Sequence, residues 1–279
     1  MMVPLAYLAR LIAATALFGL AATGAQANSD TPVVKKLSSA ADLAGWEAVG
    51  RLDVANSAFC TAVLLAPDVV LTAAHCLFDP RSGKTVPARQ VVFNAGYRNG
   101  VAGASVRARA YVLHPEFDYE GDTRGARVTR DLALVQLGRA LAPRFDPFDT
   151  GDRPRKGSDV AMVSYGKGRA ETPVLEDGCK VLARRSGMLV MDCEVALGSS
   201  GAPVFQRDTS GQMNVVSVIS SALDLNGRQY ALGTDLSRPL ALLQDLLKNR
   251  PPDASAPDPG PAIRRPGPAT GTGAKFLRP

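Results

Sequence analysis

The chain has 279 residues, a formal net charge of +6 at pH 7, and 46% hydrophobic residues. Its basic residues do not gather into a stripe with interleaved aromatic residues, so we expect no nucleic-acid partner. The length is sufficient for one sizeable core or for two smaller cores that pack together.

The first 27 residues have the pattern of a signal peptide. Arg10 precedes an apolar run over residues 11–22, and residues 25–27 (Ala-Gln-Ala) are the small residues after which a signal peptidase cleaves. The apolar run is too short for a transmembrane helix. We therefore expect a secreted or periplasmic protein without stable membrane insertion after cleavage. Residues 28–44 form an N-terminal segment or a pro-segment.

Short apolar runs, bounded by Gly, Pro, Asn and Asp, fill most of the chain between residues 58 and 237. Many short strands at this spacing predict an all-β sandwich or a pair of β-barrels. The candidate strands are residues 61–66, 69–73, 90–96, 105–113, 132–137, 159–166, 179–184, 188–194, 202–206, 214–221 and 230–236.

A linker and a charged loop connect some of these strands, and one helix follows the last strand. Residues 140–158 are rich in Pro, Gly and charge, which predicts a linker between two halves. Residues 120–130 predict a long charged loop that either contacts substrate over the cleft or is simply solvated. Ser237 predicts a helix N-cap, because apolar residues then recur on one helical face at Leu240, Leu243, Leu246 and Leu247.

The C-terminal segment, residues 250–279, differs in composition from the rest of the chain. It contains eight prolines in thirty residues. Such a segment has neither regular hydrogen-bond ladders nor a core of its own. We therefore expect a disordered tail.

A serine nucleophile needs a general base, and only His75 and His114 can supply an imidazole. His75 lies in LTAAHC and Asp131 lies in DLALV, and both precede Ser200 in GSSGAP. No histidine follows Ser200, and the serine lacks the G-x-S-x-G motif, which argues against an α/β-hydrolase. His114 is interpreted as a structural or exposed histidine, with a secondary role as a ligand as the alternative.

The stretches LTAAHC, DLALV and GSSGAP, in this order, resemble the three signatures of the trypsin-like (chymotrypsin-fold) serine peptidases. The resemblance covers about residues 45–249. It implies an all-β fold of two packed six-stranded antiparallel β-barrels, the first over about residues 45–143 and the second over about residues 155–237, followed by a helix over residues 238–249.

The resemblance also implies roles for particular residues. His75 corresponds to the general base, Asp131 to the acid that orients it, and Ser200 to the nucleophile. The backbone N–H groups of Gly198 and Ser200 correspond to the oxyanion hole. The implied activity is a serine endopeptidase that hydrolyses protein or peptide substrates through an acyl-enzyme on Ser200, as a monomer and without a cofactor.

The chain departs from the family pattern beside the nucleophile. Ser199 stands where animal digestive members have an aspartate that pairs with a newly cleaved amino terminus, and the Ile-Val-Gly-Gly start is absent. We therefore expect a nucleophile turn that orders without such cleavage, as in the bacterial branch related to glutamyl endopeptidases. Together with Ala202, this change leaves an alternative open, which is a catalytically silent trypsin-like binding module of the envelope.

Four cysteines in an exported chain indicate disulfides, and four cysteines allow three pairings. The separation of Cys60 and Cys76 is that of the family's disulfide beside the catalytic histidine, which leaves Cys179 to pair with Cys193. The cysteines are too widely spaced for a zinc site, so we expect no bound metal.

The resemblance assigns a substrate pocket less firmly. Glu194 occupies the position of the acid at the base of the primary specificity pocket, where a carboxylate would select Arg or Lys. The family's usual cysteine in this loop is replaced by Ala196, so the alternative is a surface position for Glu194. The other wall is expected from residues Ser220, Ser221 and Ala222.

Overall fold

The structure is a computed structural model, which describes residues 32–55, 58–121 and 124–250. The predicted signal peptide and residues 251–279 of the predicted tail lie outside the described residues. Within the described part of the chain, no helix has the length and apolar character needed to cross a membrane.

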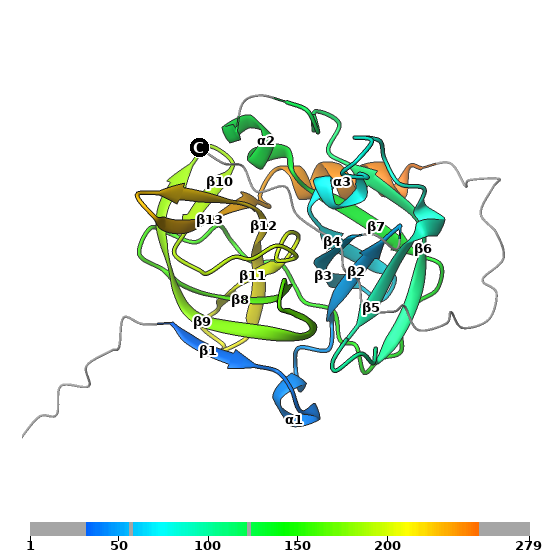
Figure 1. The fold of residues 1–279 in the computed structure, drawn as a ribbon, viewed down its shortest axis with the longest axis horizontal. Coiled ribbons are helices and arrows are strands. Elements are labelled where there is room, and N and C mark those ends of the chain that lie inside the picture. The colour runs from blue at the N-terminus through cyan, green and yellow to red at the C-terminus, as the bar shows by residue number, and fades with distance from the viewer. Residues whose placement is uncertain (1–31, 56–57, 122–123, 251–279) are drawn as a thin grey trace, which may run out of the picture. The chain divides into compact units, whose positions relative to one another are not determined.

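Six antiparallel strands close into the first barrel in the order β2-β3-β4-β7-β6-β5 (Figure 1). The strands are β2 (Val49–Val54), β3 (Ala58–Ala66), β4 (Val69–Thr72), β5 (Val91–Ala95), β6 (Ala104–Leu113) and β7 (Ala133–Leu137). Hydrophobic periodicity did not predict β2, because Arg51 and Asp53 interrupt its apolar run. Both side chains are nevertheless buried, since Arg51 Nε lies 2.7 Å from Asp53 Oδ1.

The second barrel follows the order β8-β9-β10-β13-β12-β11 and is closed by the pairing of β11 with β8. Its strands are β8 (Asp159–Gly166), β9 (Arg169–Arg185), β10 (Met188–Met191), β11 (Pro203–Arg207), β12 (Met213–Leu225) and β13 (Arg228–Asp235). All eleven predicted strands are present, although the prediction for β9 covered only its last third. The predicted fold of two six-stranded barrels is confirmed.

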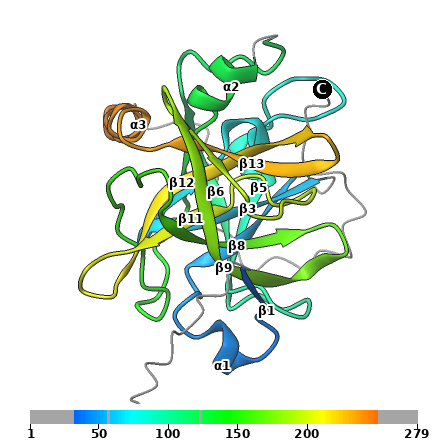
Figure 2. The same cartoon turned by 90° about the vertical axis from the view of Figure 1, so that its left-hand side faces the viewer.

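The N-terminal residues of the described chain pack onto the second barrel. Strand β1 (Val33–Lys36) pairs antiparallel with β9 outside the closed ring (Figure 2). Helix α1 (Ala40–Leu43) follows, with Ser39 and Asp42 forming a reciprocal capping box. Leu37 and Leu43 are buried in the core. Removal of residues 28–44, as expected for a pro-segment, would therefore expose these two apolar side chains.

The predicted C-terminal helix is present as α3 (Pro239–Lys248), but its start differs from the prediction. Ser237 is not the N-cap. The helix begins with Pro239, whose fixed φ and missing N–H suit a first helical position. Leu240 and Leu243 are buried, whereas Leu246 is exposed. The helix packs against β6 and β7 of the first barrel.

The segment predicted as a charged loop at residues 120–130 contains helix α2 (Arg124–Arg130). The prediction of a loop was wrong at this point because one apolar residue anchors the helix. Val128 is fully buried, and its carbonyl oxygen accepts a 2.6 Å hydrogen bond from Thr234 Oγ1 on β13. The other helical elements in the described residues are the short 3₁₀ helices η1 (Ala74–Leu77) and η2 (Ala88–Gln90).

Candidate active site

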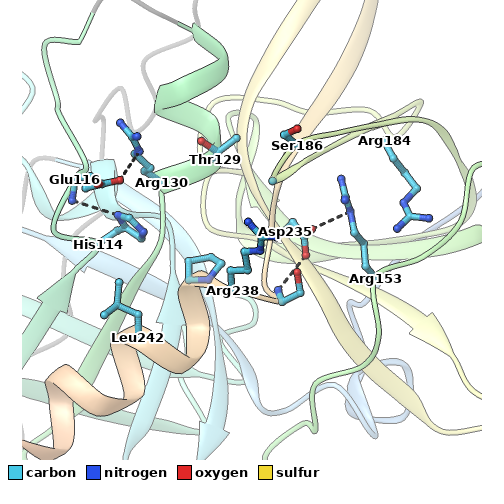
Figure 3. A pocket seen from close by; sticks show the side chains of 13 residues that line it. His114, Glu116, Thr129, Arg130, Arg153, Arg184, Ser186, Asp235, Arg238 and Leu242 are labelled. Atoms are coloured by element: carbon cyan, nitrogen blue, oxygen red, sulfur yellow. Dashed lines mark hydrogen bonds and ion pairs between the residues drawn. The ribbon is translucent and has the colours of Figure 1, made fainter.

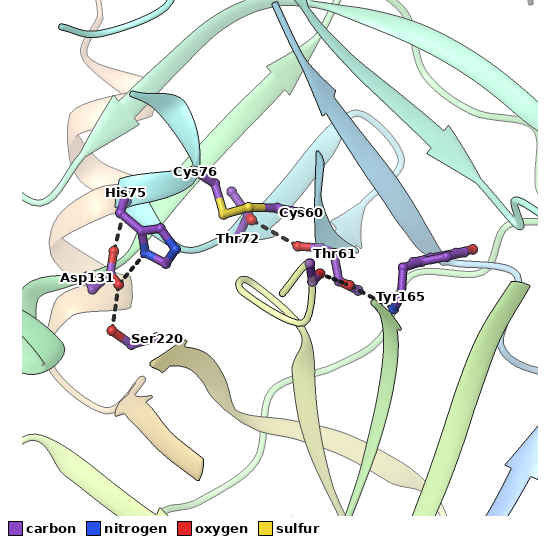
Figure 4. The surroundings of a disulfide bond; sticks show 9 residues. Cys60, Thr61, Thr72, His75, Cys76, Asp131, Tyr165 and Ser220 are labelled. Carbon is purple, nitrogen blue, oxygen red and sulfur yellow. Dashed lines mark hydrogen bonds and ion pairs between the residues drawn. A yellow bond between two sulfur atoms is a disulfide. The ribbon is translucent and has the colours of Figure 1, made fainter. Parts of the chain in front are cut away.

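The first barrel brings His75 and Asp131 together. His75 lies on η1 shortly after β4, Asp131 lies two residues before the start of β7, and these two strands are paired. The Asp131 carboxylate accepts from the His75 backbone N–H at 2.9 Å and lies 2.6 Å from His75 Nδ1 (Figure 4). An ionised carboxylate only accepts hydrogen bonds, so Nδ1 carries the proton and Nε2 is the basic nitrogen of the neutral ring. Nε2 is buried and has no hydrogen-bond partner among the described residues.

Ser220 completes the surroundings of Asp131. Its hydroxyl donates a 2.5 Å hydrogen bond to Asp131 Oδ2 from strand β12 of the second barrel (Figure 4). The buried carboxylate therefore has three donors, which offset the loss of solvent. Sequence analysis placed Ser220 in the wall of the substrate pocket and did not predict this contact. The partner lies 89 residues away along the chain, so no local pattern could reveal it.

The GSSGAP stretch forms a tight turn between β10 and β11. Gly198 and Gly201 have φ angles of +97° and +76°. A Cβ atom at Gly198 would overlap the ring of Phe59, and one at Gly201 would overlap Thr72 Oγ1 and the Thr61 carbonyl oxygen. Both positions therefore require glycine. Within the described part of the chain, the N–H groups of Gly198 and Ser200 donate no hydrogen bond, so both are available to an oxyanion.

Thr61 fixes this turn to the first barrel. Its N–H donates to the Ser200 carbonyl oxygen at 2.9 Å, and its hydroxyl donates to the Gly198 carbonyl oxygen at 3.0 Å. The preceding residue, Cys60, is bonded to Cys76, which follows His75 (Figure 4). Ser200 and His75 thus flank the same disulfide. Ser200 is buried there, but its hydroxyl makes no hydrogen bond with His75 in the described residues.

The hairpin between β8 and β9 supports the same turn from the other side. The Lys167 N–H donates to the Leu197 carbonyl oxygen at 2.6 Å. Arg169 Nη2 lies 3.3 Å from the hydroxyl of the fully buried Ser199, and 3.0 Å from Ser164 Oγ. Arg169 also donates to the Ser164 carbonyl oxygen. A guanidinium therefore lies next to the residue at which the animal digestive enzymes place an aspartate.

The predicted pocket residues differ in their surroundings. Glu194 is exposed, and its N–H donates to both carboxylate oxygens of Glu176, at 2.9 and 3.1 Å. Burial raises the pKa of Glu176 to about 7. Ser221 and Ala222 are buried, and Ser221 Oγ has no hydrogen-bond partner in the described chain. Glu176 was not identified from the sequence, because it occupies an unremarkable position in a long strand.

Both predicted disulfides, Cys60–Cys76 and Cys179–Cys193, are present. Cys60, His75 and Cys76 place their donor atoms within 4.8 Å of one another, a spacing that could suit a metal ion. The two sulfur atoms are bonded to each other, however, so they are not thiolate ligands. This cluster therefore does not have the donor set of a zinc site.

Comparison with known proteins relates this geometry to a family. The family model described as trypsin-like peptidase domain matches residues 60–213, which is more than half of the chain and includes all three signature stretches. Serine protease 56 of Mus musculus is 28% identical over 174 residues, which are 59% of this chain. The matched region spans only 26% of the mouse protein.

Proposed function

The chain belongs to the trypsin-like peptidase domain family, and from this premise we propose that it is an exported serine endopeptidase. The observation that carries the proposal is the buried pair of His75 and Asp131, joined at 2.6 Å. This pairing leaves Nε2 of His75 as a base of defined orientation. Ser200, in the neighbouring turn, is the nucleophile in this proposal.

In the proposed mechanism, Ser200 Oγ attacks the scissile carbonyl carbon and transfers its proton to His75 Nε2. Asp131 stabilises the resulting imidazolium, while the N–H groups of Gly198 and Ser200 bind the oxyanion. The imidazolium then protonates the leaving amine, and an acyl-enzyme remains on Ser200. Water attacks this ester with His75 again as the base, which releases the carboxylic acid and restores the serine.

The turn orders without a newly cleaved amino terminus in this proposal. Ser199 is neutral and could not compensate a buried ammonium group. Arg169 and Lys167 of the hairpin already hold Ser199 and Leu197, and Thr61 holds the turn from the first barrel. A neutral residue before the nucleophile favours the bacterial branch that includes glutamyl endopeptidases.

Export and the nature of the substrate are part of the same proposal. The two disulfides fit an oxidising compartment, which supports the predicted secreted or periplasmic location. Membership of a peptidase family implies a protein or peptide substrate. The monomeric state stays a prediction.

Labelling with a fluorophosphonate tests the proposal, because the reagent reacts with a serine only when a base activates it. We expect labelling of the full chain and of Ser210→Ala, a matched change at an exposed serine, but not of Ser200→Ala. A folded protein that resists labelling would contradict the proposed activity and favour the silent binding module.

Mutant kinetics test the roles within the triad. Ser200→Ala and His75→Ala should each reduce kcat by about 10⁴-fold or more, and the double variant should lose no more than the worse single variant, because the residues act as a unit. Losses that multiply in the double variant would refute the assignment.

A further inference from the structure

A cavity of about 730 Å³ opens where α2, the β9–β10 turn, the end of β13 and the start of α3 meet (Figure 3). Its volume is in the range of ligand-binding clefts. Four arginines from separate segments of the chain line it: Arg130, Arg153, Arg184 and Arg238. The proposed triad is not part of its lining.

The charges of the cavity are only partly compensated. Arg130 pairs with Glu116 at 3.0 Å, and Arg153 pairs with Asp235 at 2.8 Å. Four arginines against these two carboxylates leave a net charge of +2. Arg184 and Arg238 are exposed, and their guanidinium groups make no hydrogen bond or ion pair with any described residue. Two guanidinium groups are therefore free to bind an anion.

His114 adds little to this charge. It lines the wall beside Arg130, and its Nδ1 accepts a 3.2 Å hydrogen bond from the Glu116 N–H. Burial lowers the pKa of His114, so the ring is neutral at neutral pH. The positive charge of the cavity thus comes from the arginines alone.

The lining favours a polypeptide over an inorganic polyanion. Glu116 and Asp235 already pair with two of the four arginines, so a compact multivalent anion such as a polyphosphate would find only two unpaired guanidinium groups, which come from separate segments of the chain. Separate single charges along a chain can instead match the two free guanidinium groups. The cavity also contains Pro239 and Leu242, and the Leu242 side chain is 41% exposed. An occupant that combines carboxylates with an apolar side chain would cover this surface.

The cavity adjoins the proposed catalytic acid. Arg130 directly precedes Asp131 in the chain, and Thr234 Oγ1 lies 3.3 Å from the Asp131 carbonyl oxygen. Asp235, the next residue, belongs to the cavity wall. Since the cavity wall includes the residue next to Asp131, a substrate chain that extends beyond the cleaved bond could contact the cavity as well.

We propose that this cavity binds an acidic polypeptide segment, with Arg184 and Arg238 holding its carboxylates and Leu242 contacting an apolar side chain. Resting on the function proposed above, the segment belongs to the substrate and lies outside the residues that flank the cleaved bond. The cavity then selects substrates by their acidic flanking sequence.

A binding measurement that is independent of hydrolysis tests the site itself. The full chain carrying Ser200→Ala is titrated against a fluorescein-labelled glutamate-rich peptide that contains one leucine, with fluorescence anisotropy as the readout. We expect binding that weakens with added salt, and weaker binding of the peptide with glutamine in place of glutamate. Adding Arg184→Gln and Arg238→Gln should raise the Kd about fivefold, as expected for two partly exposed ion pairs.

The matched control is the pair Arg107→Gln and Arg109→Gln, which removes two exposed arginines from β6, outside the cavity. This control should leave the Kd unchanged. Equal losses in the two double variants would overturn the proposal, because non-specific attraction would explain them. Binding of tripolyphosphate in preference to the peptide would also overturn it. Because the assay requires no turnover, failure of the proposed peptidase activity does not affect its outcome.

A kinetic comparison then assigns the segment to the substrate. For two substrates that differ only in a glutamate-rich or glutamine-rich flank, wild type should have a lower KM for the acidic one at equal kcat. Arg184→Gln with Arg238→Gln should abolish that difference. A difference that survives in this variant would refute the assignment.

Discussion

Replacing Arg169 by methionine should impair the nucleophile turn while the barrels stay folded. Methionine keeps an unbranched apolar stem but removes the guanidinium, which lies 3.3 Å from Ser199 Oγ and 3.0 Å from Ser164 Oγ. Ser199 keeps its 3.2 Å hydrogen bond from the Ala196 N–H. The turn is therefore weakened at the residue before the nucleophile without leaving that hydroxyl without a partner.

The size of the effect follows from the hydrogen bond to Ser199. A hydrogen bond that involves a charged group contributes about 1.5–3 kcal/mol. The Arg169–Ser199 contact is long at 3.3 Å and the guanidinium is only partly buried, so the lower figure applies. A loss of about 1.5 kcal/mol in the ordered turn corresponds to about a tenfold lower rate of serine acylation.

The assay is the second-order rate constant for fluorophosphonate labelling of Ser200, together with kcat and KM for a peptide substrate. Arg169→Lys keeps the charge but not the planar fork, so it should recover part of the rate. Arg155→Met, at an exposed arginine in the segment that precedes β8, should behave as wild type. We expect kcat to fall and KM to change little. Wild-type labelling in folded Arg169→Met would refute this account of the turn.

Three further changes have defined outcomes. Ser220→Ala removes one donor to Asp131 and should lower kcat about tenfold; unchanged kcat would show that the 2.5 Å contact is dispensable. Burial raises the pKa of Glu176 to about 7, so the wild type loses stability as the pH rises from about 4.5 to 7. Glu176→Gln should therefore raise the free energy of unfolding by up to about 3 kcal/mol above pH 7 and leave it unchanged below about pH 4.5, which urea titrations at these two pH values test. Cys60→Ser with Cys76→Ser should lower the free energy of unfolding by about 3 kcal/mol in the same assay, because the disulfide joins residues 16 apart and so restricts the unfolded chain. A negligible change would contradict this account of the disulfide.

Sequence by itself determined the all-β fold class, because short apolar runs and the turn residues that bound them are local features. The presence of only two histidines limited the candidates for a general base, and the resemblance of the three signature stretches implied the roles of His75, Asp131 and Ser200. The signature stretches led to the family that the comparison shows. The roles of the three residues stay predictions until labelling tests them.

Local patterns failed where a distant partner decides the structure. Strand β2 was not predicted because Arg51 and Asp53 interrupt its apolar run and are buried with one another as partners. The helix in the charged segment depends on Val128, which binds a strand 106 residues away.

Only the tertiary structure showed the surroundings of the candidate site. Ser220 bonds Asp131, Arg169 bonds Ser199, and Glu176 bonds the Glu194 backbone, at separations of 89, 30 and 18 residues. The arginine-lined cavity likewise combines residues from widely separated parts of the chain. A polar side chain has the same appearance in sequence whether it faces solvent or a buried partner. Its partner, and thus its role, is decided by the packing of the barrels.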